Sequence, residues 1–328
     1  MKIMAPEHES LPESGPGICL VGTGSIARDH MATFEELGLS RRLWVVSRRD
    51  EAARDFAECF GFENATTEFG DALKDPAVEV VLIASPSPTH VEQATRSLVA
   101  GKDVIVEIPV GLSFASVELL AGQARETGRR VFACHTMRSF AGLRMVRKWI
   151  LAGDFTVTQV DGVFAIPRRR NQGWNGERSW VDNLLWHHAC HQVDATLWLL
   201  GTSEVGDVTG MVGRRHPDVG MYMDLTVAFS CGGDIPVTQA LTYNCDSLLW
   251  ELRFTGLQDV LTFRNGRLVD DAGSDVVEPV SIRDLLVQNT EIFDALANGS
   301  ASPFDLSCVL PSYNALQRID DCLAWSDD

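Results

Sequence analysis

The chain has 328 residues, of which 45% are apolar and 22% are charged, a composition typical of a globular protein and unlike that of a disordered one. Its 45 acidic residues outnumber its 28 basic ones, and the net charge of −17 repels phosphate backbones and anionic lipids, so we expect neither nucleic acid nor a membrane as partner. The length predicts about two domains.

Residues 1–17 are rich in Pro, Glu and Ser and lack the apolar segment of a signal peptide, so we expect a flexible polar tail. The longest apolar runs, such as 78–84, fall well short of the roughly 20 residues that a membrane span needs. Eight cysteines are scattered without a CxxC pair, which is typical of reduced thiols and indicates a cytoplasmic location.

From residue 18 to 136, short β-branched runs alternate with longer amphipathic ones. The predicted strands are 18–21, 43–46, 78–84, 104–106 and 131–134, and the predicted helices are 26–37, 51–60, 89–100 and 114–127. Continuous buried strands joined by helices imply a parallel sheet that is covered on both faces. Residues 18–136 therefore predict a doubly wound α/β domain.

The pattern changes after residue 136. A helix over 143–151 and a strand over 156–166 precede an arginine-rich loop and a histidine-rich helix. Strands over 205–212, 223–230, 237–242, 250–254 and 260–263 then follow one another, and helices over 282–298 and 305–325 end the chain. Consecutive strands without intervening helices favour antiparallel pairing, so residues 137–328 predict an α+β domain with a large, mostly antiparallel sheet.

A glycine loop directly follows the first predicted strand. Gly22, Gly24 and Ala27 have the spacing GxGxxA: the first glycine permits a tight turn, the second lets a pyrophosphate approach the backbone, and the small alanine allows close helix packing. This context indicates a Rossmann domain that binds a dinucleotide. The residues expected to contact the cofactor here are Gly22, Thr23, Gly24, Ser25 and Ile26.

The end of the second predicted strand bears on the choice of nucleotide. NAD-binding proteins usually have an acidic residue there, whereas this chain has Ser47, Arg48 and Arg49. A hydroxyl and guanidinium groups suit a 2′-phosphate, so NADP is favoured and NAD is possible. The alternative is that these arginines form only a solvated turn.

The histidine-rich helix contains the candidate catalytic groups. His187, His191 and Asp194 lie at i, i+4 and i+7 and are expected to share one face, while His188 and Cys190 should point elsewhere. An imidazole titrates near neutral pH, so His191 or His187 is the predicted general base, and Asp194 either orients His191 or makes a packing contact. We expect no metal, because His188 replaces the glutamate that the HExxH zinc motif needs.

Arginines provide the second signal. Arg168, Arg169, Arg170 and Arg178 are concentrated in a loop just before the histidine helix, in a chain that is otherwise acidic. Guanidinium groups bind carboxylates with two parallel hydrogen bonds, so Arg168, Arg169 and Arg178, together with Arg138, are the predicted ligands of a carboxylate-bearing small molecule. The alternative is a solvated charge run.

The stretch "ASPSPTHVEQATRSLVAGKDVIVEIPVGLSFASVELL" resembles the glucose-fructose oxidoreductase/inositol dehydrogenase family, in which a proline-rich loop borders the nicotinamide and a Glu-Lys-Pro motif follows. Here the motif reads Glu107, Ile108, Pro109, so the lysine that the family uses near the reacting carbon is replaced. The resemblance implies cofactor contacts by Ser85, Pro86, His90, Glu107 and Pro109.

The segments "HTMRSF" and "RSWVDNLLWHHACHQVD" are similar to a subgroup of that family that also lacks the lysine. By this resemblance His191 is the active-site histidine, and His187 stands where relatives often carry an acid. His188 is a further candidate for substrate binding, and the alternative is an ordinary helical histidine whose hydrogen bonds are satisfied. The implied reaction transfers a hydride from a carboxylated cyclic hemiacetal to NADP+ and gives a pyrone dicarboxylate, in the degradation of aromatic compounds. A homodimer through the open face of the antiparallel sheet is also implied.

Three alternatives stay open at this point. A sugar or cyclitol dehydrogenase of the same family would normally rely on the lysine that Ile108 replaces. A non-catalytic dinucleotide-binding sensor would bind nucleotide without turnover. A zinc hydrolase would require a third ligand in addition to two histidines.

Overall fold

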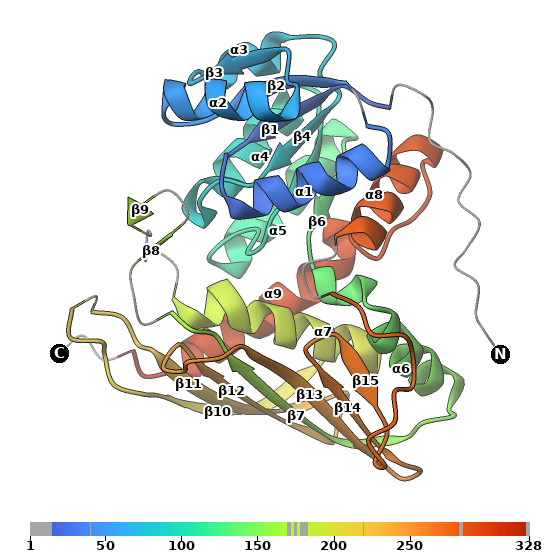
Figure 1. The fold of residues 1–328 in the computed structure, drawn as a ribbon. Coiled ribbons are helices and arrows are strands. Elements are labelled where there is room, and N and C mark those ends of the chain that lie inside the picture. Colours follow the sequence, from blue (N-terminus) through green and yellow to red (C-terminus); the bar gives the residue numbers. More distant parts are fainter. Residues whose placement is uncertain are drawn as a thin grey trace.

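The computed structural model describes residues 15–39, 41–168, 172–173, 176–177, 183–218, 220–281 and 285–325. Two large sheets lie at opposite ends of the molecule, and helices fill the space between them (Figure 1). Most of the expected polar tail, residues 1–14, lies outside the described residues. The predicted domain limits at residues 17 and 136 stay predictions.

The first sheet has six parallel strands in the order β3-β2-β1-β4-β5-β6. Its strands are β1 (Ile18–Val21), β2 (Arg42–Val46), β3 (Asn64–Thr66), β4 (Val80–Ile83), β5 (Asp103–Val106) and β6 (Val131–Ala133). All four residues of β1 are buried, as expected for a strand covered on both faces. This strand order is that of the Rossmann fold, and it places the carboxyl ends of β1 and β4 side by side, where such folds bind ligands.

Five helices accompany this sheet: α1 (Ser25–Glu36), α2 (Asp50–Phe60), α3 (Phe69–Lys74), α4 (His90–Val99) and α5 (Phe114–Thr127). The sequence did not predict β3 and α3. All three residues of β3 are half-buried at the sheet edge, and α3 has only six residues, so neither contains a long apolar run.

The second sheet has seven strands in the order β10-β11-β12-β7-β13-β14-β15. Its strands are β7 (Val157–Ala165), β10 (Val205–Val212), β11 (Asp224–Cys231), β12 (Ile235–Thr242), β13 (Leu249–Gly256), β14 (Val260–Arg264) and β15 (Arg267–Val269). Within this sheet only β7 and β12 pair in parallel, because β7 lies between β12 and β13. The other pairs are antiparallel, so the predicted mostly antiparallel sheet is confirmed.

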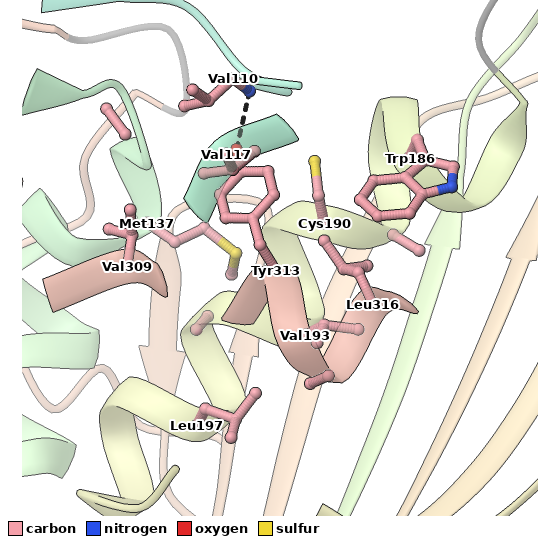
Figure 2. Packing of buried hydrophobic residues seen from close by; sticks show 14 of the residues in the cluster. Val110, Val117, Met137, Trp186, Cys190, Val193, Leu197, Val309, Tyr313 and Leu316 are labelled. Carbon is pink, nitrogen blue, oxygen red and sulfur yellow. Dashed lines mark hydrogen bonds between the residues drawn. The ribbon is translucent and has the colours of Figure 1, made fainter. Parts of the chain in front are cut away.

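Three helices cover one face of this sheet: α6 (Ala141–Ala152), α7 (Cys190–Leu200) and α9 (Leu306–Cys322) (Figure 1). The last helices tie the two halves together. Helix α8 (Leu286–Asn298) returns to the Rossmann part, where Phe293 packs edge-on against Phe34 at 5.4 Å between ring centres. From α9, the Tyr313 hydroxyl accepts the Val110 N–H at 2.8 Å, and Figure 2 shows this ring among side chains such as Cys190 of α7.

None of the helices in the described part of the chain is long and apolar enough to cross a membrane.

Candidate active site

The glycine loop joins β1 to α1 in a geometry that leaves room for an anion. Gly22 has φ +110°, and a Cβ there would lie 2.4 Å from the carbonyl oxygen of Ala84, so only glycine fits between the ends of β1 and β4. A Cβ at Gly24 would meet nothing within 4 Å, and no side chain caps the first turn of α1. Exposed N–H groups at a helix start beside open space fit the pyrophosphate of a dinucleotide.

The positions of Ser25 and Ile26 agree with this picture, since both belong to the first turn of α1. Thr23 is nearly buried, and its hydroxyl lies 3.3 Å from the hydroxyl of Ser47, which joins the end of β1 to the end of β2. The glycine loop is therefore in contact with the end of β2.

A cavity of about 290 Å³ opens beside the end of β2. Arg49 and Arg28 line it, and the Arg28 guanidinium lies over the rings of Phe56 and Phe60 at 5.4 and 5.5 Å. The exposed side chain of Arg48 follows directly after Ser47. The same cavity is also lined by two acids, Glu51 and Asp55. A phosphate in this cavity would therefore bind to the arginines, because the two acids repel it.

The loops after β4 and β5 hold each other in place. His90 is 1% exposed, with Nδ1 at 2.8 Å from the Pro109 carbonyl oxygen and Nε2 at 2.7 Å from the Ser85 carbonyl oxygen. Both ring nitrogens thus face backbone, which corrects the expectation that His90 itself contacts the cofactor: it fixes the loops that would do so. The Ser85 hydroxyl donates to Gln93 at 2.6 Å, and Pro86 is exposed.

Glu107, at the end of β5, is bound to helix α1. Its Oε1 lies 2.7 Å from His30 Nε2, and Asn289 Nδ2 donates to His30 Nδ1 at 3.1 Å, so Nε2 carries the proton that Glu107 accepts. His30, Glu107 and Cys134 also form a group with metal-ligand chemistry. Zinc would hold its ligand atoms about 3.3 Å apart, so the 2.7 Å contact is a hydrogen bond rather than two arms of a metal site.

Ile108 occupies the position of the family lysine, and its partly buried side chain packs against the hydrophobic core. Lys102, which directly precedes β5, does not take the place of that lysine. Its Nζ is buried and donates to the carbonyl oxygens of Asp75 and Val78 at 2.8 and 2.7 Å. Neither position therefore offers an available amine for proton transfer.

The histidine-rich segment begins as a π-helix, Leu185–Ala189, and continues as α7. The extra residue in a π turn changes the angular spacing, which corrects the expectation that His188 points away. The rings of His187 and His188 are 4.3 Å apart and those of His188 and His191 are 6.3 Å apart. We call these three the histidine cluster.

Tyr243 and Arg168 extend the histidine cluster toward the arginine-rich loop. The Tyr243 hydroxyl lies 2.6 Å from His188 Nδ1, and the Arg168 guanidinium lies over the Tyr243 ring at 5.3 Å. Trp250 packs edge-on against His191 at 5.1 Å. Sequence reasoning missed Tyr243, although its place just after a predicted strand could have indicated it.

His191 is neutral at physiological pH. Burial, followed by the charges of His135, His187 and Arg168, lowers its pKa to about 3, although Asp194 acts in the opposite direction. Its Nδ1 is buried and has no hydrogen-bond partner among the described residues. A neutral imidazole can accept a proton, and because Nδ1 is closed to solvent, Nε2 is the nitrogen that a substrate could reach.

Asp194 does not orient His191. It is fully buried, and Arg138 Nε and Nη2 donate to its two oxygens at 2.8 and 2.6 Å. Ser312 donates to the same carboxylate at 2.7 Å, and His135 Nδ1 lies 3.3 Å from it. Burial raises the pKa of Asp194, but Arg138, then His135 and these hydrogen bonds, outweigh that effect and hold it below its usual value.

This arrangement corrects two expectations. Arg138 is 2% exposed, and its Nη1 and Nη2 also donate to the carbonyl oxygens of Pro303 and Cys308, so it cannot bind a substrate carboxylate. Asp194 is an internal counter-ion rather than a catalytic acid or orienting group. Burial lowers the pKa of the neighbouring His135 to about 4, despite the opposing charge of Asp194.

Of the predicted substrate arginines, Arg168 is half-buried beside the histidine cluster. Arg169 and Arg178 lie outside the described residues. Sequence reasoning also missed His135, which follows β6 at the carboxyl edge of the parallel sheet, a position where ligand sites are common.

Comparison with known proteins agrees with both halves of the chain. Residues 17–135 match the model of an oxidoreductase family with an NAD-binding Rossmann fold, and residues 142–278 match that of the C-terminal part of bacterial oxidoreductases. The 4-carboxy-2-hydroxymuconate-6-semialdehyde dehydrogenase of Sphingobium sp. (strain NBRC 103272 / SYK-6) is 29% identical over 316 residues, which cover 92% of this chain and 97% of that protein.

A second relative is scyllo-inositol 2-dehydrogenase (NADP(+)) IolW of Bacillus subtilis (strain 168), 27% identical over 71% of this chain and 67% of its own length. Among solved structures, GenD2 from gentamicin A biosynthesis in complex with NAD superimposes with a TM-score of 0.83 at 18% identity, covering 98% of this chain and 97% of that one. Levoglucosan dehydrogenase in complex with NADH and L-sorbose gives 0.83 at 16% identity, with coverage of 94% and 96%. These likenesses establish the fold.

Proposed function

The chain belongs to the oxidoreductase family with an NAD-binding Rossmann fold, and on that premise we propose that it oxidises the cyclic hemiacetal of 4-carboxy-2-hydroxymuconate-6-semialdehyde, or a similar carboxylated ring, with NADP+. Members of this family are NAD(P)-dependent dehydrogenases that act on CH–OH groups. The proposed product is a pyrone dicarboxylate. The relative that acts on this semialdehyde aligns over nearly the whole chain, which supports the proposal.

The observation that carries the proposal is the position of Arg168 beside the histidine cluster. Its guanidinium lies over Tyr243, whose hydroxyl contacts His188, and its charge acts on His191. A fixed cation next to a neutral imidazole can hold a carboxylate while the imidazole receives the proton of the neighbouring hydroxyl.

In this mechanism each group has one task. His191, or His187 beside it, takes the hydroxyl proton of the hemiacetal as the carbon–oxygen double bond of the lactone forms. Arg168 holds a ring carboxylate, and Tyr243 fixes the ring of His188 through the 2.6 Å hydrogen bond. A bound nicotinamide supplies the acceptor for the hydride.

The glycine loop and the cavity beside β2 would hold the cofactor. The open space at Gly24 would admit the pyrophosphate, and Arg49 and Ser47 would contact a 2′-phosphate. NADP is proposed over NAD because neither Ser47, Arg48 nor Arg49 is an acid that would repel that phosphate.

The test is a steady-state assay with this hemiacetal, scyllo-inositol and glucose, each with NADP+ and NAD+. We expect the highest kcat/KM for the hemiacetal with NADP+. Arg168→Gln should lower kcat/KM for the hemiacetal about tenfold or more, because it removes the charge-assisted hydrogen bond to the carboxylate. The matched control is Arg125→Gln on the surface of α5, which should leave kcat/KM unchanged. A preference for inositol would instead favour the cyclitol dehydrogenase function of the second relative.

We also propose that the protein forms a homodimer through the open face of the seven-stranded sheet. We further propose that it works in the cytoplasm, in a pathway that degrades aromatic compounds. The described helices cover only one face of that sheet (Figure 1). By the alternating burial of β11 and β12, small residues such as Ala228 and Ala240 belong to the other face. Light scattering checks this: wild type should have twice the monomer mass, and Ala240→Arg should reduce it to the monomer mass. A monomeric wild type would refute the dimer.

A further inference from the structure

A cavity of about 760 Å³ lies between α6, the end of α7, α8 and the loop over residues 300–303. Helices α6 and α8 lie on the same side of the molecule in Figure 1. None of the residues that line this space belongs to the glycine loop, the histidine cluster or the cavity beside β2. Its volume is in the range of about 300–1,000 Å³ that small-molecule sites occupy. We call it the α6–α8 cavity.

Cations gather on one wall of the α6–α8 cavity. Arg144, Arg147 and Lys148 lie at i, i+3 and i+4 of α6 and therefore share one helix face. Two acids, Glu291 and Asp294, line the opposite wall on α8. In a chain with a net charge of −17, a cavity with more cations than acids is unusual.

Arg144 is already neutralised. It forms a bidentate ion pair with Glu291, in which Nη2 donates to Oε2 at 2.6 Å, and its Nε donates to the Arg138 carbonyl oxygen at 2.8 Å. Glu291 is therefore engaged with Arg144, and the other charged groups that line the cavity are Arg147, Lys148 and Asp294.

Arg147 is held in place but lacks an acceptor. Its guanidinium lies over the Trp198 ring at 5.1 Å, and its Nε is buried without a hydrogen-bond partner among the described residues. Within that part of the chain, neither Arg147 nor Lys148 has an ion pair. Burial, and then the charge of Arg138, lowers the pKa of Arg147, as expected for a cation without a nearby anion. Buried donors without acceptors are rare in native proteins.

Apolar groups complete the cavity. Trp198, Leu151 and Pro303 provide surfaces on which a flat or hydrocarbon group can pack. A space of this size admits an organic anion whose hydrocarbon part packs on these surfaces while its carboxylate lies near the arginine.

We propose that the α6–α8 cavity is a second ligand site that binds a small organic carboxylate, held by Arg147 and Lys148 with its hydrocarbon part against Trp198 and Pro303. Arg147 and Lys148 line the cavity, and their charged ends donate to the ligand carboxylate, while Arg147 Nε stays buried beneath them. This site is separate from the dehydrogenase site and does not depend on the substrate proposed for it.

Isothermal titration of the full chain, saturated with NADP+, tests the proposal with phthalate as probe and with benzamide and inorganic phosphate as controls. We expect phthalate to bind at one Arg147-dependent site, with benzamide and phosphate much weaker. Arg147→Gln should weaken phthalate binding about tenfold or more, as expected for a lost charge-assisted bond, while Arg125→Gln should leave it unchanged. Ala301→Trp, which fills the cavity without removing a charge, should also abolish binding.

Arg168→Gln separates the two sites. If phthalate binding is lost in that variant and kept in Arg147→Gln, the probe occupies the dehydrogenase site and the α6–α8 proposal is wrong. Equal affinity in wild type and both cavity variants, or no binding of phthalate at all, also overturns it. A failure of the proposed dehydrogenase substrate would appear only in turnover and would leave these titrations unaffected.

Discussion

Arg138 Nη2 lies 2.6 Å from Asp194 Oδ1, and the two side chains are 2% and 0% exposed. This buried pair joins the segment after β6 to the middle of α7, the helix that carries His191 one turn earlier. Because Arg138 also donates to backbone carbonyls at Pro303 and Cys308, one guanidinium fixes three parts of the chain around the candidate site.

Asp194→Asn should strongly destabilise the protein, because it leaves the Arg138 charge buried without a counter-ion. The expected loss in the free energy of unfolding is about 3–5 kcal/mol, measured by urea denaturation at neutral pH. Asp161→Asn, on the accessible part of β7, is the control and should cost much less. A loss of under about 1 kcal/mol for Asp194→Asn would contradict the buried ion pair.

His191→Asn should lower kcat roughly 100- to 10,000-fold while leaving the Kd for NADP+ unchanged, since the residue is proposed to take a proton and not to bind nucleotide. His187→Asn is the matched comparison. If only His187→Asn loses activity, the base has been assigned to the wrong member of the histidine cluster.

The pH dependence of kcat/KM distinguishes the same two histidines. Because the pKa of His191 is lowered to about 3, its neutral form persists through mildly acidic conditions. With His191 as base, kcat/KM should stay constant from neutral pH down to about pH 5. A fall centred near the usual histidine pKa of roughly 6.5 would indicate that another imidazole takes the proton.

His135 should make the folded state sensitive to acid. Its pKa is lowered from 6.5 to about 4, so the unfolded chain binds a proton more readily than the folded one between these values. The stabilisation is fully present above pH 6.5 and is lost as the pH falls toward 4, by about 3 kcal/mol in all. His135→Leu should flatten this part of the stability profile, measured by urea denaturation at several pH values. An unchanged slope would assign the acid sensitivity to other groups.

Arg49→Ala should raise the KM for NADP+ about 10- to 100-fold and leave that for NAD+ nearly unchanged, because only NADP+ carries the 2′-phosphate. Arg54→Ala removes a cation from the same helix region, where the side chain is 72% exposed and pairs with Asp50, and serves as control. Equal changes for both nucleotides would mean that Arg49 does not read the phosphate.

The sequence alone determined the features that depend on local pattern. Alternating buried strands and amphipathic helices, with glycines at the first turn, specified the Rossmann part, because the positive φ of Gly22 and the apolar run of β1 are local features of the chain. The run of consecutive strands likewise indicated the second sheet. Among the elements it missed, β3, α3 and β15 are too short to create a periodic signal.

Only the tertiary structure decided which polar groups meet. Helical spacing placed Asp194 on the face of His191, where it would either orient that ring or make a packing contact. Instead, Arg138, 56 positions earlier, neutralises it across a buried contact that no local pattern encodes. The π-helix likewise brought His188 into the histidine cluster, since one extra residue per turn changes the face on which a side chain lies. Long-range pairing of buried charges depends on packing between distant segments, and the chemistry of the site depends on that pairing.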